Sequence, residues 1–239
     1  MEGRSCGPPP AEIGDEEVNL GRSPSPSCSG SQLKKNRSLS KIIQSEISLK
    51  PWIAQTPTVA EARPAACLCC NAASCPVGGR IQIHGHGLRE RQVRGPLGPG
   101  EKAVTVGVLG RRYLCVVCGA VFLVVPREVL PRRQYSAAAI GFALAVWGLV
   151  KATARAVRLL ISPSTVLGFD AMTGWVTLRR WAKAVKARCL FSSVPAAGPS
   201  ATLRAVAALA ATALAASADP TTRHLPLEHR AFLGAAQAA

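Results

Sequence analysis

The sequence predicts an α+β protein in which a small β domain built around zinc precedes an all-α domain, after a disordered N-terminal segment. Two pairs of cysteines with the spacing of metal ligands enclose a stretch rich in β-forming residues. Over residues 131–190, apolar side chains recur every three or four positions, as they do along one face of a helix. These two patterns place the β domain before the α domain.

Composition divides the 239 residues into four segments. Residues 1–60 are rich in Pro and Ser and poor in aromatic side chains, which predicts a disordered extension, with 39–49 suited to a short helix. The β domain spans 64–126 and the helical domain spans 131–190. The last segment, 191–239, begins with a Pro/Gly linker and continues as an Ala-rich helix and a tail.

Alternation of apolar and polar residues predicts the strands of the β domain. The expected strands cover residues 80–86, 103–109, 113–117 and 120–125. We expect a break at 110–112, which begins with glycine, and a loop at the Pro/Gly-rich residues 95–102.

Four cysteines form two C-x-x-C pairs separated by 44 residues. The candidate zinc ligands are Cys67, Cys70, Cys115 and Cys118. Each pair suits a tight turn that directs both sulfurs at one point, and zinc accepts four thiolates in a tetrahedron. The residues that follow the pairs, Asn71 and Gly119, both tolerate the positive φ that such turns often need. This pattern predicts a zinc ribbon with a closed, structural site.

Other interpretations of the cysteines remain. They could be reduced core residues without metal, and a redox-active pair is less well supported because neither pair begins a helix in a βαβ context. His84 and His86 are rival ligands, since their i, i+2 spacing places both on one face of a strand. Four thiolates already complete a zinc site, so we expect these histidines to face solvent.

Positive charge is concentrated in the second half of the chain. The protein has 29 Lys and Arg against 13 Asp and Glu, a net charge of +16. Residues 127–188 hold eleven basic and two acidic residues, a net charge of +9. A field of this kind suits an anionic partner such as nucleic acid or a membrane surface.

The helical domain has a pattern typical of helix-turn-helix proteins. A helix ending at 161, a Ser-Pro turn and a second helix over 164–172 would form this motif, and 177–188 forms a basic helix with an apolar stripe. A solvated helix face is the simpler alternative. The candidate DNA-contacting residues are Arg111, Arg112, Arg155, Arg158, Ser164, Thr165, Arg179, Arg180, Lys183 and Lys186.

Over about 64–190, the chain resembles the N-terminal zinc-binding and helix-turn-helix modules of bacterial insertion-sequence transposases and transposase-like proteins of unassigned function. The residues that carry this resemblance are Cys67, Cys70, Arg111, Arg112, Tyr113, Cys115, Cys118, Gly119, Pro131, Tyr135 and Ser136, with RLLISPSTV at 158–166 and LRRW at 178–181. The resemblance implies DNA binding at element ends. Full transposases hold two catalytic metal ions with three separated acidic residues. After residue 130 this chain has only Asp170, Asp219 and Glu228, so we expect no catalysis.

The expected function is therefore zinc-dependent, non-catalytic DNA binding. The alternatives are a zinc-ribbon adaptor between proteins and a membrane-associated helical protein. The apolar runs 137–150 and 205–218 have fourteen residues each, short of the ~20 that cross a bilayer, so we expect buried helices. No secretory signal is visible and the cysteines are clustered, which favours a cytoplasmic location. The Ala-rich helix at 201–218 either packs on the helical domain or mediates self-association.

Overall fold

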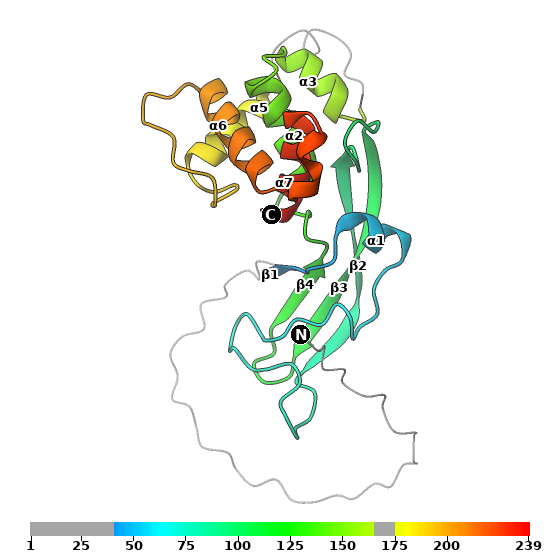
Figure 1. Ribbon diagram of the computed structural model, residues 1–239. Helices are drawn as coiled ribbons and strands as arrows, with labels where there is room; N and C mark the ends of the chain where they lie inside the picture. Colours follow the sequence, from blue (N-terminus) through cyan, green and yellow to red (C-terminus); the bar gives the residue numbers. More distant parts are fainter. Residues whose placement is uncertain (1–40, 165–174) are drawn as a thin grey trace, which may run out of the picture.

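The computed structural model describes residues 41–164 and 175–239. It has an α+β architecture in which a twisted sheet stands beside a group of packed helices (Figure 1). Two separate hydrophobic cores correspond to these parts, one in the sheet and one among the helices. The predicted fold class is confirmed at this level.

The sheet has four strands in the order β1-β4-β3-β2. The strands are β1 (Lys41–Gln44), β2 (Ile83–Gly95), β3 (Val104–Cys115) and β4 (Val121–Val125). β2 pairs with β3 and β3 with β4 in antiparallel fashion, whereas β1 lies parallel to β4. The long β2–β3 hairpin extends from the cysteine-rich end of the sheet to the helices (Figure 1).

The expected break at 110–112 is wrong, because β3 continues through it. Arg111 and Arg112 pair with Val124 and Leu123 of β4, so this stretch has partner strands on both sides. Gly110 allows the close approach of β3 to β4, since a Cβ at this position would lie 3.0 Å from the side chain of Leu123 in β4. Pairing on two sides outweighs the low strand propensity of glycine.

The prediction of disorder for 1–60 is wrong for residues 41–60; residues 1–40 lie outside the described residues. Residues 41–44 form β1 rather than a helix, because they pair with β4. Helix α1 (Leu49–Ala54) follows, and its Trp52 is buried and donates from Nε1 to the Leu109 carbonyl at 2.8 Å. Burial of one large aromatic side chain offsets part of the entropy lost by ordering this segment.

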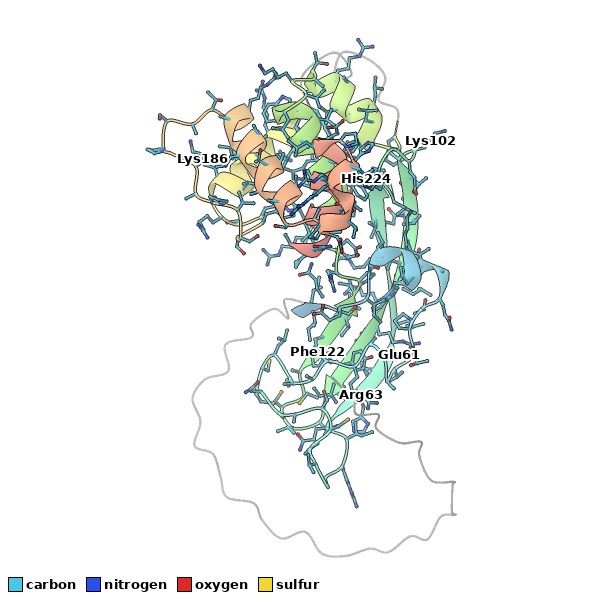
Figure 2. The ribbon with its side chains drawn as sticks, in the orientation of Figure 1. Glu61, Arg63, Lys102, Phe122, Lys186 and His224 are labelled. Atoms are coloured by element: carbon cyan, nitrogen blue, oxygen red, sulfur yellow. The ribbon has the colours of Figure 1, made fainter. Side chains whose placement is uncertain are left out.

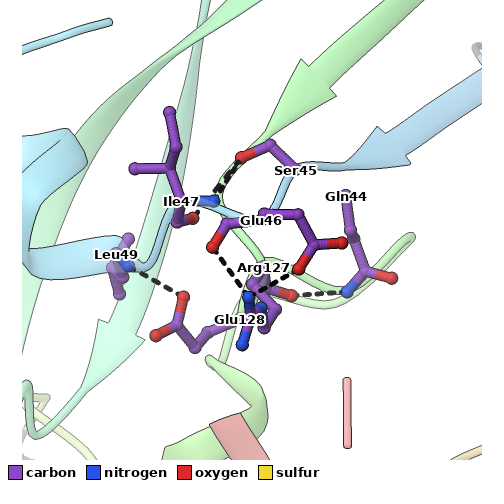
Figure 3. Close-up of polar contacts among 7 residues, drawn as sticks. All are labelled: Gln44, Ser45, Glu46, Ile47, Leu49, Arg127 and Glu128. Carbon is purple, nitrogen blue, oxygen red and sulfur yellow. Dashed lines mark hydrogen bonds and ion pairs between the residues drawn. The ribbon is translucent and has the colours of Figure 1, made fainter. Parts of the chain in front are cut away.

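Polar contacts join the end of β1 and the segment after it to the segment after β4 (Figure 3). The Gln44 side chain donates to the Arg127 carbonyl at 2.6 Å, and Arg127 forms an ion pair with Glu46 at 2.7 Å. The Leu49 N–H at the start of α1 donates to the Glu128 carboxylate at 2.8 Å. Glu128 therefore caps a helix that the side chain of Ser48, the N-cap residue, leaves uncapped.

The helical part contains α2 (Ala137–Gly148), α3 (Ala154–Ile161), α5 (Val176–Lys186), α6 (Leu203–Ala216), the 3-10 helix η1 (Pro220–His224) and α7 (Leu227–Gln237). Ser136 is the N-cap of α2, and its hydroxyl accepts from the Ala139 N–H at 3.1 Å. Every residue of α2 is buried, which confirms that this apolar run is a core helix. Among the described residues, no helix is long and apolar enough to cross a membrane.

The sequence predicted only a tail after residue 218, and this is wrong, because the segment forms η1 and α7. Helix α7 packs against α2 and α6 (Figure 1). Gly141 on α2 and Gly234 on α7 allow this close approach, since a Cβ at either would overlap a neighbouring helix. The alternative that the Ala-rich helix packs on the helical domain is therefore observed: α6 lies in the same core as α2.

Candidate metal centre

The four predicted cysteines come together in a lobe formed by residues 64–82 and 115–120, which we call the metal lobe. This lobe lies at the end of the sheet away from the helices, the end where Figure 2 labels Arg63. Each pair sits in a turn with the same hydrogen bonds. The Asn71 N–H donates to the Cys67 carbonyl at 3.0 Å, and the Gly119 N–H donates to the Cys115 carbonyl at 2.8 Å. The predicted positive φ is confirmed at both residues, 58° at Asn71 and 71° at Gly119.

The equivalence of the two turns extends one residue further. The N–H of Cys67 donates to the carbonyl of Ala72 at 2.9 Å, and the N–H of Cys115 donates to that of Ala120 at 2.9 Å. Two turns that are separated by 44 residues thus present their thiols in the same way. The same two backbone hydrogen bonds therefore shape both turns, which packing of apolar side chains alone would not require.

The sulfur positions match a tetrahedral site. All four Sγ atoms lie within 4.8 Å of one another. Cys67 Sγ lies 3.7 Å from Cys118 Sγ, and Cys70 Sγ lies 3.7 Å from Cys115 Sγ. A tetrahedron with Zn–S bonds of about 2.3 Å has edges of about 3.8 Å. The donor set and its spacing therefore fit a divalent metal ion, which would be held by Cys67, Cys70, Cys115 and Cys118.

Backbone donors and burial act on these thiols in opposite directions. Burial raises the pKa of Cys67, but the N–H groups of Cys70 and Cys69 outweigh it and lower that pKa to about 7. At Cys118 the Ala120 N–H lowers the pKa, but burial and the neighbouring thiols raise it to about 12. Four adjacent thiolates repel one another, so a bound cation is what would allow all four to ionise together.

The side chains of the other cysteines and of the histidines in this region are not part of the four-sulfur cluster. Cys69 is exposed within the first turn, and Cys75 accepts a hydrogen bond from Arg63 at 3.5 Å. His84 and His86 are exposed, and His84 Nε2 lies 2.9 Å from the Ile81 carbonyl. Across the described ranges, the four predicted cysteines are the one group of this kind that could hold a metal ion.

The metal lobe is anchored on the sheet through its two buried cysteines. Cys67 and Cys115 belong to the core of the sheet, and Cys115 pairs with Ile83 at the end of the β2–β3 ladder. Beside them, Tyr113 donates from its hydroxyl to the Val59 carbonyl at 2.8 Å and stacks on Phe122. Metal binding would therefore stabilise the same core that holds the strands together.

The two candidate DNA-contacting arginines of β3 lie on opposite faces of the sheet, as neighbours in a strand must. Arg111 donates from Nε to the Pro57 carbonyl, and its charge contributes to a lowered pKa of Glu61, after hydrogen bonds from Thr58. Arg111 thus holds the loop after α1. Arg112 projects from the other face, which it shares with Arg89 and Arg91 of β2.

The candidate residues of the helical part are distributed over α3 and α5. Arg155, Arg179, Arg180, Lys183 and Ser164 are exposed, and Arg158 is half-buried. Lys186 donates to the carbonyls of Pro199 and Ala201, at 2.7 and 3.0 Å, and so fixes the linker. Of the expected helix at 164–172, only Ser164 is among the described residues, so Thr165 lies outside them. The apolar stripe of α5 is confirmed, since Leu178, Trp181, Ala182 and Val185 are buried.

A cavity of about 400 Å³ lies between the two parts of the molecule. Its walls include the start of α1, the loop at 96–99, α7 and Glu128. Burial raises the pKa of Glu128, although its hydrogen bonds from backbone N–H groups, including that of Leu49, oppose the shift. Glu128 is 8% exposed and lies at the junction between sheet and helices.

Replacing Glu128 by glutamine is expected to change how stability depends on pH. Because the folded-state pKa is raised, the folded protein holds this proton more tightly than the unfolded chain does. The wild type therefore loses stability as the pH rises from the ordinary carboxyl value of about 4.3 through the raised value. Glu128→Gln lacks this loss, so its stability relative to wild type increases with pH. Denaturant unfolding from pH 4 to 8 measures the free energy of unfolding of both proteins, with Glu90→Gln as the control at an exposed position of β2. Parallel stability curves for Glu128→Gln and wild type would contradict this prediction.

Comparison of the chain with models of protein families, with curated proteins and with solved structures gave no match.

Proposed function

We propose that the chain is a zinc-dependent, non-catalytic DNA-binding protein that works in a reducing compartment such as the cytoplasm. The cysteine cluster carries the first half of this proposal. Two turns with the same hydrogen bonds hold four thiols at the spacing of a zinc tetrahedron. Four protein ligands close a zinc site and leave no position for water, so the ion would be structural. The metal lobe and its strands would then form a zinc ribbon.

Charge supports the second half. Helix α5 buries one face and exposes Arg179, Arg180 and Lys183 on the other, in a protein with a net charge of +16. Guanidinium groups bind phosphate oxygens in pairs, and each phosphate that is neutralised releases counterions. In this proposal α3 would be the first helix of a helix-turn-helix unit like that of the transposase modules that the sequence resembles, and the expected second helix lies outside the described residues except for Ser164.

Replacing Arg179 and Arg180 together by glutamine is expected to weaken DNA binding. Loss of two phosphate contacts lowers the slope of log K against log salt by about two and weakens binding on the order of tenfold at 0.1 M salt. Fluorescence anisotropy with a labelled duplex at several salt concentrations measures both values. The charge-matched control is Arg80→Gln/Arg223→Gln, at exposed positions on the metal lobe and on η1. Equal slopes for the two double variants would contradict a specific role of α5.

A protein–protein adaptor is the second candidate, and one observation favours it. The turns around the cysteines expose large apolar side chains: Leu68 is 55% exposed, Val116 57% and Val117 56%. Exposed apolar groups grouped in one place are typical of protein contacts. DNA affinity that hardly changes with salt would favour this function over DNA binding.

A further inference from the structure

Three arginines share one face of the β2–β3 hairpin. Arg91 pairs with Val108 and Arg89 with Gly110, and Arg112 is the next residue of β3 on that face. Side chains two residues apart on a strand are about 7 Å apart, and diagonal neighbours across strands are separated by about 7–8 Å. Arg91, Arg89 and Arg112 therefore follow one another along the hairpin at intervals of about 7–8 Å, and we call this line the arginine row.

The carboxylate nearest to the row in sequence is on the other face. Glu90 lies between Arg89 and Arg91 in β2, and its carboxylate occupies the space beside Gly107 where a Cβ would be. Gly107 is the neighbour of Val108 in β3, so the alternation of the strand places Glu90 opposite the row. Within residues 41–164 and 175–239 the ion pairs are Lys50–Glu101 and Arg127–Glu46, and neither involves the row.

The row thus concentrates like charge without an acidic partner in the part of the chain that the structure describes. Burial lowers the pKa of Arg91, and the charge of Arg89 lowers it further. Like charges held at this distance destabilise the folded state unless an anion offsets them. Phosphate is an anion that arginine binds well, since the planar guanidinium group matches the geometry of the phosphate oxygens.

Direct contacts connect the row to the helical part. Arg91 donates to the Arg133 carbonyl at 3.5 Å, and the Arg94 N–H donates to the Gln134 carbonyl at 2.7 Å. The next residue, Tyr135, reaches Ser162 at the end of α3 with its hydroxyl at 3.2 Å and contacts Trp181 of α5 edge-to-face. The row is therefore held in a fixed position relative to α3 and α5.

We propose that the arginine row is a second phosphate-binding surface for duplex DNA, in addition to α5. The inference rests on the proposed function and extends it, because it assigns DNA contact to the sheet as well as to the helices. Backbone contacts of this kind position a duplex and do not read its sequence. β2 has 13 residues and spans about 43 Å, of which the row occupies about a third, so the row would contact a few phosphates in addition to those bound by α5.

The test compares Arg89→Gln/Arg112→Gln with the Arg80→Gln/Arg223→Gln control in the full chain. Arg91 is left in place because it also holds the Arg133 carbonyl. The probes are two labelled duplexes of unrelated sequence, about 30 base pairs long, titrated at several salt concentrations. We expect the row variant to lower the salt slope by about two for both sequences and to weaken binding on the order of tenfold at 0.1 M salt. Without DNA, the circular dichroism of the row variant should match that of wild type, and its melting temperature should be equal or higher, because the substitution removes repulsion between the arginines.

Three other outcomes would overturn the inference, and they show whether the row alone or the proposed DNA binding has failed. If the α5 variant weakens binding and the row variant behaves as the control does, DNA binding stands and the row has no part in it. If the row variant weakens binding to one sequence only, the row reads bases and is not a backbone contact. If the wild-type chain binds neither duplex, the proposed function fails and this inference fails with it.

Discussion

Replacing Cys115 by serine is expected to abolish metal binding and to unfold the metal lobe. Loss of one thiolate breaks a closed four-ligand site, and structural zinc contributes an apparent 10–16 kcal/mol in zinc-finger peptides, about as much as the whole stability of a small domain. Cys115 is fully buried at the end of β3, so the disorder would extend into the sheet. Elemental analysis measures the metal, and amide hydrogen exchange across 64–126 measures the unfolding.

Two controls separate the metal from the substitution itself. Cys189→Ser changes an exposed cysteine after α5 and should keep one zinc per chain and the wild-type melting temperature. Treating the wild-type chain with a chelator removes the ion without any substitution, and it should increase exchange over the same residues as Cys115→Ser does. A Cys115→Ser protein that retains a full equivalent of zinc and normal protection would contradict the assignment of ligands.

Replacing Gly234 by alanine is expected to destabilise the helical part by about 3 kcal/mol or more. Alanine normally stabilises the interior of a helix by about 0.5–1 kcal/mol relative to glycine. Here a Cβ would overlap the carbonyl oxygen of Leu214, which belongs to the backbone of α6 and cannot rotate away. Helices α6 and α7 would have to separate and leave gaps in a core that both of them share with α2.

Denaturant unfolding followed by circular dichroism measures this effect. Gly198→Ala is the matched control, because it makes the same change in the linker, where no atom lies within 4 Å of the added Cβ. We expect this control to be neutral or stabilising by up to about 1 kcal/mol. A Gly234→Ala protein with an unfolding midpoint at or above that of wild type would show that α6 and α7 do not pack as closely as described.

Local signals predicted the two cysteine turns, the end of α3 at Ile161 and the basic helix α5. Spacing of the cysteines and the tolerance of Asn71 and Gly119 for positive φ identified both turns, because these features act over a few residues. The N-cap at Ser136 was predictable for the same reason. Segments whose order depends on distant partners were missed. β1 forms through pairing with β4, and α7 through packing on α2 and α6, and neither partner is near in sequence.

The positions of the charged side chains likewise depend on strand pairing and could not be predicted from the sequence. Arg111 and Arg112 look alike in sequence, but the strand turns Arg111 toward the Pro57 carbonyl and leaves Arg112 on the face with Arg89. The expected strand ended at residue 86, so the alternation of Arg89, Glu90 and Arg91 was not recognised. In a strand, an R-E-R pattern places both arginines on one face and the glutamate on the other. The register with β3 is needed to show that Arg112 lies on the same face as the two arginines.

X-ray absorption at the zinc edge, on the full chain purified under reducing conditions, tests the account most directly. Four thiolates predict a first shell of four sulfur atoms at about 2.3 Å, with about one zinc per chain by elemental analysis. A shell containing nitrogen or oxygen at about 2.0–2.1 Å would mean that His84, His86 or water completes the site, which would no longer be a closed four-thiolate centre. A folded chain without zinc that does not take up the ion when it is supplied would contradict the metal centre itself.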